Sequence, residues 1–249
     1  MRPASVGFQC PDDVADGHRS TGQQRPLRTS FGGRQTSGRP YVTFVFLALN
    51  VLAFIAQGFP LSSNSAANHF TLDYVDSNFA IASQHQYYRL LTGAFLHVAI
   101  WHIAVNMLVL LLVGPALEAM LGRVRYTAVY LLSAVGGGVL VYLVEGVGYA
   151  TLGASGAIFG MFAAYWVLAR RVRADTSAMT GTIVLNLIIS VTFPGISLWG
   201  HLGGLITGAL VGAVLAFSPP RRWQIQLAGT VAIAAILVVA TLIRTSSLT

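Results

Sequence analysis

Long apolar runs separated by short polar segments dominate the chain from Tyr41 onward. Because about 20 predominantly apolar residues cross the hydrocarbon core of a bilayer as a helix, we predict seven membrane-spanning helices. The fifth is short and ends at Phe193-Pro194-Gly195, so the pattern defines it least well. The predicted helices cover residues 41–58, 94–114, 126–145, 153–170, 179–193, 198–217 and 223–243.

The segment before the first helix has a different composition. Residues 1–40 are rich in Gly, Ser, Gln, Arg and Pro and contain no apolar run, which is typical of a disordered tail. No cleavable signal peptide is visible there, so we interpret the first helix as an uncleaved signal anchor. We expect deletion of residues 1–38 to leave the activity of the protein in vitro nearly unchanged, because the tail has no apolar content with which to dock.

One connection between predicted helices, residues 59–93, is longer than the roughly 12–15 residues that loops seldom exceed. Its aromatic residues indicate that it lies partly in the membrane interface. The pattern as a whole predicts an all-α membrane protein with three parts. These are a disordered basic tail over residues 1–40, a six-helix core over 41–217, and a seventh transmembrane helix with a short tail over 218–249.

Composition agrees with a membrane protein and excludes several other classes. The chain of 249 residues is 55% hydrophobic and 9% charged, whereas soluble domains contain roughly 25% charged residues. The formal charge is +7, but the basic residues are all arginine and lie in short clusters, so we predict no nucleic-acid partner. The single cysteine, Cys10, cannot form an intrachain disulfide or a thiolate zinc site. We therefore expect no metal and no cofactor.

The arginines predict the orientation. Cytoplasmic segments of membrane proteins carry an excess of basic residues, and of the 15 basic residues only Arg89 and Arg244 fall on the side opposite the N-terminus. We therefore predict a cytoplasmic N-terminus, an external C-terminus and a multi-pass position in a plasma membrane. The absence of lysine is typical of a GC-rich bacterial genome.

A serine near the start of the fourth predicted helix is a candidate nucleophile. Ser155 lies in the run Gly153-Ala-Ser-Gly-Ala157. Taken alone, a serine among small residues is more often a packing residue or bonds back to a carbonyl one turn earlier. The nucleophile elbow of soluble hydrolases would need glycine at position 157 and a strand before the serine. Other features must therefore support a catalytic role.

Topology supplies that support through His201 in the sixth helix. The fourth and sixth helices run in the same direction, and Ser155 and His201 each lie about three residues from the start of their helix. Glycines at four-residue spacing allow the two helices to approach closely: Gly156 and Gly160, and Gly200, Gly204 and Gly208. A serine needs a nearby base to act as a nucleophile, so we predict a Ser155–His201 dyad.

Two polar residues of the second helix are candidates for stabilising an oxyanion. His102 and Asn106 are four residues apart and share one helix face, and acyl transfer needs hydrogen-bond donors at the developing negative charge. The alternative is that both residues only tie helices together. The predicted helix start puts His102 about 12 Å deep, which is deeper than Ser155.

Several motifs in a fixed order resemble the rhomboid family of intramembrane serine proteases. They are Gly153-Ala-Ser-Gly-Ala-Ile-Phe-Gly160, His97-x4-His102-x3-Asn106, the segment from Gly114-Pro to Arg125, and Gly200-His-Leu-Gly-Gly204. The resemblance covers about residues 41–217. It implies Ser155 as nucleophile, His201 as base, His102 and Asn106 as oxyanion donors, a membrane-embedded first loop and a fifth helix that lines the substrate gate.

Two positions depart from the family pattern. Tyr88-Arg89 replaces the usual Trp-Arg pair of the first loop, and Phe159 replaces the usual tyrosine one turn after the serine. The function implied is cleavage of single-span transmembrane proteins near the outer face, so the expected partners are such substrates and the lipid bilayer. A non-catalytic rhomboid-like protein that binds membrane clients and a transporter or channel are the alternatives.

Acidic residues are scarce, which bears on how His201 is oriented. The part of the chain after residue 40 contains Asp73, Asp76, Glu118, Glu145 and Asp175, and helix counting puts none of them at the depth of the dyad. Glu118 is expected to contribute to stability through Arg123 or Arg125. We therefore predict that Phe159, four residues after Ser155, packs against the imidazole ring of His201 in place of a carboxylate partner.

Overall fold

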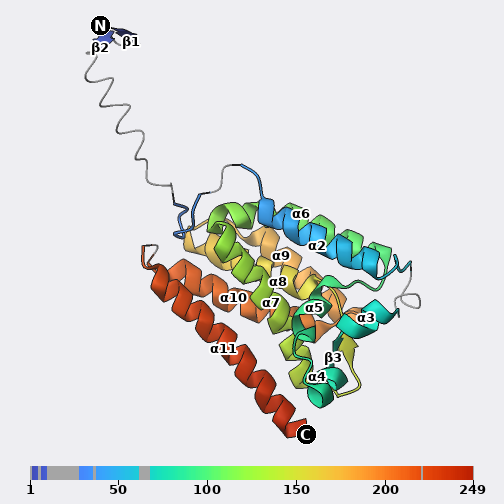
Figure 1. Cartoon of the computed structure of the whole chain (residues 1–249). Helices are drawn as coiled ribbons and strands as arrows, with labels where there is room; N and C mark the ends of the chain where they lie inside the picture. Colours follow the sequence, from blue (N-terminus) through green and yellow to red (C-terminus); the bar gives the residue numbers. More distant parts are fainter. Residues whose placement is uncertain are drawn as a thin grey trace.

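The computed structural model describes residues 2–4, 7–9, 28–35, 38–61, 68–219 and 221–248. Its main body is a bundle of long helices, with the last helix along one side (Figure 1). A helix lies at each of the seven places where the apolar pattern predicts one. These helices are α2 (Tyr41–Ala56), α6 (Ile100–Leu121), α7 (Arg123–Val144), α8 (Ser155–Arg171), α9 (Ser177–Thr192), α10 (Leu198–Phe217) and α11 (Trp223–Leu248).

Among the described residues, four helices are long and apolar enough to cross a membrane: α6, α7, α10 and α11. Helices α2 and α9 are apolar but shorter, with 16 residues each. Many large apolar side chains on these helices are exposed at the outside of the bundle. The chain is therefore an all-α, multi-pass membrane protein.

The start and the end of α6 differ from the prediction of 94–114. Residues Gly93–Phe95 form a 3-10 helix, η2, and the backbone is extended at Ala99, so α6 begins only at Ile100. The helix then continues through Pro115 to Leu121. A proline lacks one backbone donor, which packed transmembrane helices tolerate when neighbouring groups satisfy the carbonyl that is freed.

The long first loop is folded. It contains α3 (His69–Tyr74), β3 (Asp76–Ser77), α4 (Asn78–Gln84) and α5 (Arg89–Thr92). The buried Arg89 donates hydrogen bonds to the carbonyls of Leu72 at 2.7 Å and Val75 at 3.1 Å. Strand β3 pairs antiparallel with β4 (Ala150–Thr151), which lies directly before α8. The loop is thereby tied to the segment that leads to Ser155.

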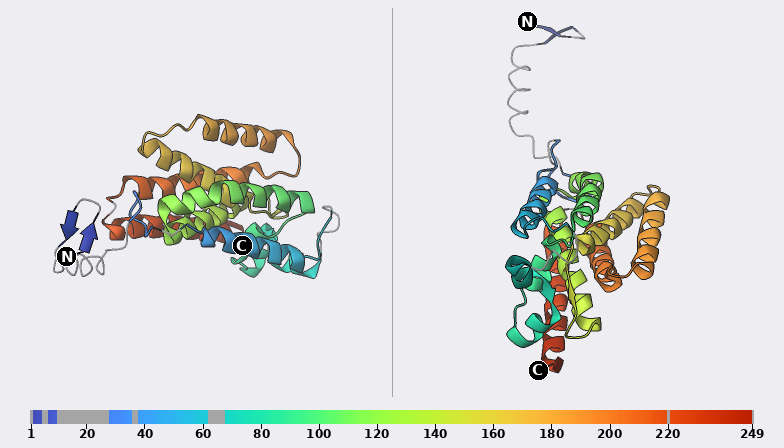
Figure 2. Two further views of the ribbon diagram at one scale, coloured as in Figure 1. Left: turned by 90° about the horizontal axis from the view of Figure 1, so that it is seen from above. Right: turned by 90° about the vertical axis from the view of Figure 1, so that its right-hand side faces the viewer.

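Helices α8 and α10 pack through a stripe of small residues. A Cβ atom added at Gly204 would collide with the carbonyl of Gly156, and one added at Gly208 would collide with Gly160. Helix α7 joins them, since a Cβ at Gly137 would lie 2.8 Å from the carbonyl oxygen of Gly200. The close helix contact predicted from glycine spacing is confirmed, and Figure 2 shows the three helices within the bundle.

The N-terminal segment contains structure that its composition did not indicate. Strands β1 (Arg2–Ala4) and β2 (Gly7–Gln9) pair antiparallel. Residues 28–35 form a loop in which Phe31 is 5% exposed. Gly32 has φ +82°, which allows the turn. The predicted disorder of residues 1–40 therefore does not extend to this loop, and most of that prediction falls outside the described residues.

Candidate active site

The starts of three helices bring Ser155, His201 and His102 to a similar level. Ser155 is the first residue of α8, His201 the fourth of α10 and His102 the third of α6. The depth difference expected for His102 disappears because α6 begins six residues later than predicted. All three residues thus lie in the first turn of their helices.

Helices α8 and α10 are also in contact beside Ser155 and His201. A Cβ atom at Gly156 would be 3.2 Å from the carbonyl oxygen of Gly200. Ser155 directly precedes one of these glycines, and His201 directly follows the other. Ser155 is half-buried and His201 is 7% exposed. Among the described residues, no hydrogen bond joins the hydroxyl of Ser155 to the imidazole of His201.

Two side chains hold the imidazole ring of His201. The ring of Phe159 stacks on it with a centroid distance of 4.1 Å and an interplanar angle of 13°. The predicted packing of Phe159 against His201 is therefore confirmed. The hydroxyl oxygen of Ser190, on α9, lies 2.6 Å from Nδ1 of the same ring.

The hydrogen bonds of Ser190 favour one tautomer of His201. The Ser190 hydroxyl donates to the carbonyl oxygen of Asn186 at 2.6 Å. A hydroxyl has only one proton to donate, and the Ser190 hydroxyl uses it in the bond to Asn186. In the contact between Ser190 and His201, the ring nitrogen Nδ1 must therefore donate and the hydroxyl oxygen accept. Nε2 of His201 then keeps its lone pair, which is the form that a general base requires.

Sequence reasoning missed Ser190. It is the one buried residue of α9, although the helix has 16 residues. The available signal was its spacing from Asn186, because two polar residues four positions apart mark one face of an otherwise apolar helix. That signal does not identify His201 as the partner.

His102 lies against the backbone that leads to Ser155. A Cβ atom at Gly153 would be 2.8 Å from Cε1 and 3.0 Å from Nε2 of His102. Gly153 also has φ +133°, a conformation that L side chains rarely adopt. Its N–H donates to the carbonyl of Gly93 at 3.0 Å. Glycine at position 153 is therefore needed both for the backbone conformation and for the space that the ring of His102 occupies.

Asn106 makes a different contact from the one expected of an oxyanion donor. It is 6% exposed, and its Nδ2 donates to the carbonyl oxygen of His102 at 2.9 Å. This contact is local to α6. In this arrangement Asn106 supports the helix turn that carries His102, and the second N–H of its amide has no hydrogen-bond partner among the described residues.

Backbone donors are present at the start of α8. The first N–H groups of a helix have no carbonyl partner within the helix, and together they form the positive end of the helix dipole. Ala154 precedes the helix and has no polar side chain with which to cap them. The N–H groups of Ser155 and its neighbours are therefore suited to bind a negatively charged oxygen.

No carboxylate of the described residues contacts His201. Glu118 accepts hydrogen bonds from the N–H groups of Val42 and Thr43 at 3.1 and 2.9 Å, so the expected pairing of Glu118 with Arg123 or Arg125 is wrong. Its carboxylate instead binds unpaired donors in the first turn of α2.

The buried acid of the first loop is Asp76. Burial raises its pKa to about 7, although the positive charge of Arg89 acts to lower the pKa.

Metal binding has no candidate site in the described part of the chain. Among those residues, no group of three or more His, Cys, Asp or Glu side chains could hold an ion.

Comparison with known proteins identifies related sequences. Residues 84–218, more than half of the chain, match the Rhomboid domain. Rhomboid protease GluP of Bacillus subtilis is 30% identical over 207 residues, which is 81% of this chain and 40% of GluP. The rhomboid-family protein YdcA of Bacillus subtilis is 32% identical over 74% of this chain and 92% of YdcA. Rhomboid-type serine protease 2 of Emericella nidulans is 35% identical over 54% of this chain and 28% of its own length.

Proposed function

Because the chain belongs to the rhomboid family, we propose that it is an intramembrane serine endopeptidase with Ser155 as nucleophile and His201 as general base. The observation that carries this proposal is the contact of α8 with α10 at Gly156 and Gly200, directly beside both residues. The stacked and hydrogen-bonded ring of His201 adds support, since a base must be oriented before it can accept a proton.

The reaction follows acyl-transfer chemistry. Nε2 of His201 takes the proton of the Ser155 hydroxyl while the hydroxyl oxygen of Ser155 attacks the carbonyl carbon of the scissile peptide. The tetrahedral intermediate collapses, and the leaving amine receives the proton from His201. Water then attacks the acyl-enzyme, with His201 again accepting a proton, and hydrolysis releases the second product and restores the serine.

The oxyanion of the intermediate forms beside the start of α8. The N–H of Ser155 supplies one donor, and Nε2 of His102 supplies a second when it carries the proton. Donors already in place are effective because they need not reorganise as charge develops. Asn106 contributes by holding the helix turn of His102 in position.

The membrane topology is part of the proposal. All seven helices cross the membrane, the N-terminus is cytoplasmic and the C-terminus is on the opposite side of a bacterial plasma membrane. Helix α8 has 17 residues, which gives it a length of about 26 Å, less than the roughly 30 Å of the hydrocarbon core. Ser155 at its start then lies below the membrane surface, where a cavity open to the outside supplies water.

The substrate class follows from this position. A single-span transmembrane protein presents a helix whose carbonyls are hydrogen-bonded, so the scissile segment must unwind before attack. Helix α9 is suited to be the gate because Ser190 is its one buried residue and apolar side chains such as Val184, Ile188 and Val191 are exposed. Figure 2 shows α9 at an edge of the bundle.

The deciding experiment measures cleavage of a purified single-span substrate in detergent and in liposomes. The wild type should cleave it and react with a fluorophosphonate serine probe. Ser155→Ala and His201→Ala should each lower cleavage by about 10³-fold or more, and the double variant should be no slower than either. Ser246→Ala, at an exposed serine of α11, is the control. Binding of the substrate without turnover by the wild type would favour the non-catalytic alternative.

A further inference from the structure

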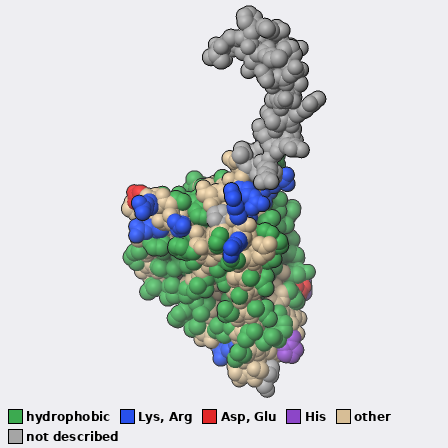
Figure 3. All heavy atoms as spheres, turned by 90° about the vertical axis from the view of Figure 1, so that its left-hand side faces the viewer, with side chains coloured by type: hydrophobic (Ala, Val, Ile, Leu, Met, Phe, Trp, Pro, Cys, Tyr) green, Lys and Arg blue, Asp and Glu red, His purple; other side chains and the backbone are tan. Residues whose placement is uncertain are grey.

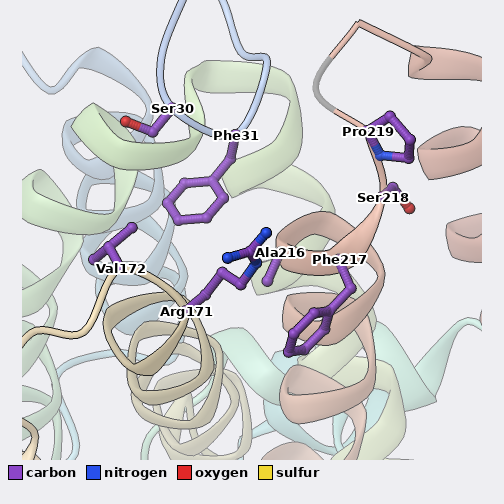
Figure 4. Close-up of a pocket in the computed structure, with 8 residues that line it drawn as sticks. All are labelled: Ser30, Phe31, Arg171, Val172, Ala216, Phe217, Ser218 and Pro219. Carbon is purple, nitrogen blue, oxygen red and sulfur yellow. The ribbon is translucent and has the colours of Figure 1, made fainter.

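A cavity of about 400 Å³ lies at the arginine-rich end of the bundle, far along the helices from Ser155. Three segments enclose it: the loop 28–35, the C-terminal end of α8 and the link between α10 and α11. Figure 4 shows the guanidinium of Arg171 between the ring of Phe31 and the α10 end. The lining residues are Ser30, Phe31, Arg171, Val172, Ala216, Phe217, Ser218 and Pro219.

The charge at this end is strongly positive. Figure 3 shows basic side chains gathered there on one face. The acids described at this end are already engaged, because Glu118 binds the start of α2 and Asp175 accepts hydrogen bonds from Ser177. The arginines concerned are Arg28, Arg34, Arg39, Arg123, Arg125, Arg170, Arg171, Arg173, Arg221 and Arg222.

Within this group, Arg171 lines the cavity. Its guanidinium lies over the ring of Phe217, 5.8 Å from the centroid. It forms no hydrogen bond or ion pair with any other residue that the structure describes. No residue in the described part of the chain uses its five N–H donors, and a planar guanidinium matches a phosphate group in geometry.

The walls of the cavity are held in place. Phe31 is buried, and its carbonyl oxygen accepts a hydrogen bond from Nε2 of Gln226 at 3.1 Å. The amide oxygen Oε1 of Gln226 accepts a hydrogen bond from Nε of Arg125 at 2.8 Å. Within the loop, the N–H of Thr29 donates to the carbonyl of Gly33 at 2.8 Å. The loop is therefore a packed wall of the cavity and not a loose cover.

The lining is amphipathic. Ser30 and Ser218 present hydroxyl groups, whereas Val172 and Phe217 are apolar and are 52% and 69% exposed at the outside of the bundle. A ligand in this cavity would meet the guanidinium of Arg171 on one side and the lipid-facing surface on the other. Basic pockets between transmembrane helices are suited to anionic lipid headgroups.

We propose that this cavity is a binding site for the phosphate headgroup of an anionic phospholipid, with Arg171 as its main ligand and the acyl chains along Val172 and Phe217. The ends of α8 and α10 oppose binding, because each helix C-terminus carries about half a negative charge. The full charge of Arg171, together with Arg170, Arg173, Arg221 and Arg222, exceeds that effect. The proposal does not depend on protease activity.

The test is native mass spectrometry of the purified full chain in detergent, titrated with phosphatidylglycerol or phosphatidylcholine. The wild type should bind phosphatidylglycerol more tightly. Arg171→Gln should weaken that binding about tenfold, because it removes the charge-assisted hydrogen bonds to the phosphate group as well as a charge. Arg173→Gln removes the same charge two residues away, outside the cavity lining, and should change the affinity by less than about twofold.

A second pair of variants tests the opposite wall. Ser30→Glu places a negative charge beside the proposed headgroup and should weaken phosphatidylglycerol binding more than Arg171→Gln does, whereas Ser30→Gln should not. Equal losses in Arg171→Gln and Arg173→Gln would mean diffuse attraction to the arginines and would overturn the proposal. If the wild type bound phosphatidylcholine as tightly as phosphatidylglycerol, the cavity would not select an anionic headgroup and the proposal would be wrong. Displacement of phosphatidylglycerol by millimolar inorganic phosphate would assign the site to a soluble anion.

Discussion

The hydroxyl oxygen of Ser190 lies 2.6 Å from Nδ1 of His201 and so links α9 to α10. In a Ser-His-Asp triad, a buried carboxylate holds this nitrogen of the histidine. Here a hydroxyl takes that position, on a helix that buries no other residue. The orientation of the His201 ring therefore depends in part on where α9 lies, and movement of α9 would break this hydrogen bond.

Replacing Ser190 by alanine should lower kcat about fivefold, because one hydrogen bond contributes about 1 kcal/mol. KM should stay within about twofold, since Ser190 lies behind the imidazole. Ser190→Thr keeps the hydroxyl and should retain most activity. Thr192→Ala is the matched control, because Thr192 also bonds back along α9, to Ile188, but is exposed. Wild-type kcat in Ser190→Ala would leave Phe159 as the residue that holds the ring.

Replacing Phe159 by leucine should lower kcat several-fold while the protein stays folded. Leucine fills much of the buried volume but cannot stack on the imidazole of His201, whereas alanine would also open a cavity in the core. Phe159→Tyr keeps the ring and is the control. Cleavage rates are compared with Tm, and unchanged kcat in Phe159→Leu would show that stacking is not needed for orientation.

His102 and Asn106 should differ in their effect on cleavage. His102→Ala should lower kcat/KM by about 10²–10³-fold, the usual loss for one oxyanion donor. Asn106→Ala should cost no more than about tenfold, because the amide of Asn106 is bonded to the carbonyl of His102. Both are measured on the same substrate. Equal losses would indicate that Asn106 turns towards the oxyanion during the reaction.

The buried Asp76 should make stability depend on pH. Its pKa is raised from 3.8 to about 7, mainly by burial, so the folded state binds the proton more tightly than the unfolded state. The stabilising effect is complete below pH 3.8 and is lost as the pH rises through 7.

Asp76→Asn cannot ionise. The difference between its Tm and that of the wild type should therefore shift in favour of the variant by about 2 °C or more as the pH rises from 5 to 8. Asp73→Asn changes an exposed acid of the same loop and should show no such trend. A constant Tm difference for Asp76→Asn across this range would mean that Asp76 keeps one protonation state.

Two truncations should separate the docked loop from the residues before it. Deleting residues 1–27 should leave Tm nearly unchanged. Deleting residues 1–38 also removes Phe31, whose burial contributes about 1.5–3 kcal/mol, and should lower Tm by several degrees. Phe31→Ala in the full chain should reproduce much of that loss. Equal Tm values for the two truncations would show that the loop does not stabilise the core, as the composition of the tail alone implies.

The sequence by itself determined where the long apolar helices lie and that α8 pairs with α10. The bilayer requires long apolar helices, so hydropathy indicates where they lie. Close helix packing requires small residues, so the spacing of Gly156 and Gly160 against Gly204 and Gly208 indicates which helices meet. Both signals are local in the chain, and both are confirmed by the structure.

Only the tertiary structure decided which polar groups are partners. Glu118 contacts Thr43, 75 residues away, and Ser190 contacts His201 on a neighbouring helix. The same holds for Phe31, whose carbonyl meets Gln226 across 195 residues. Such contacts depend on the rotation and depth of whole helices. A single polar residue has no periodicity that reveals them, because a hydrogen bond is directional and forms only where packing brings donor and acceptor together.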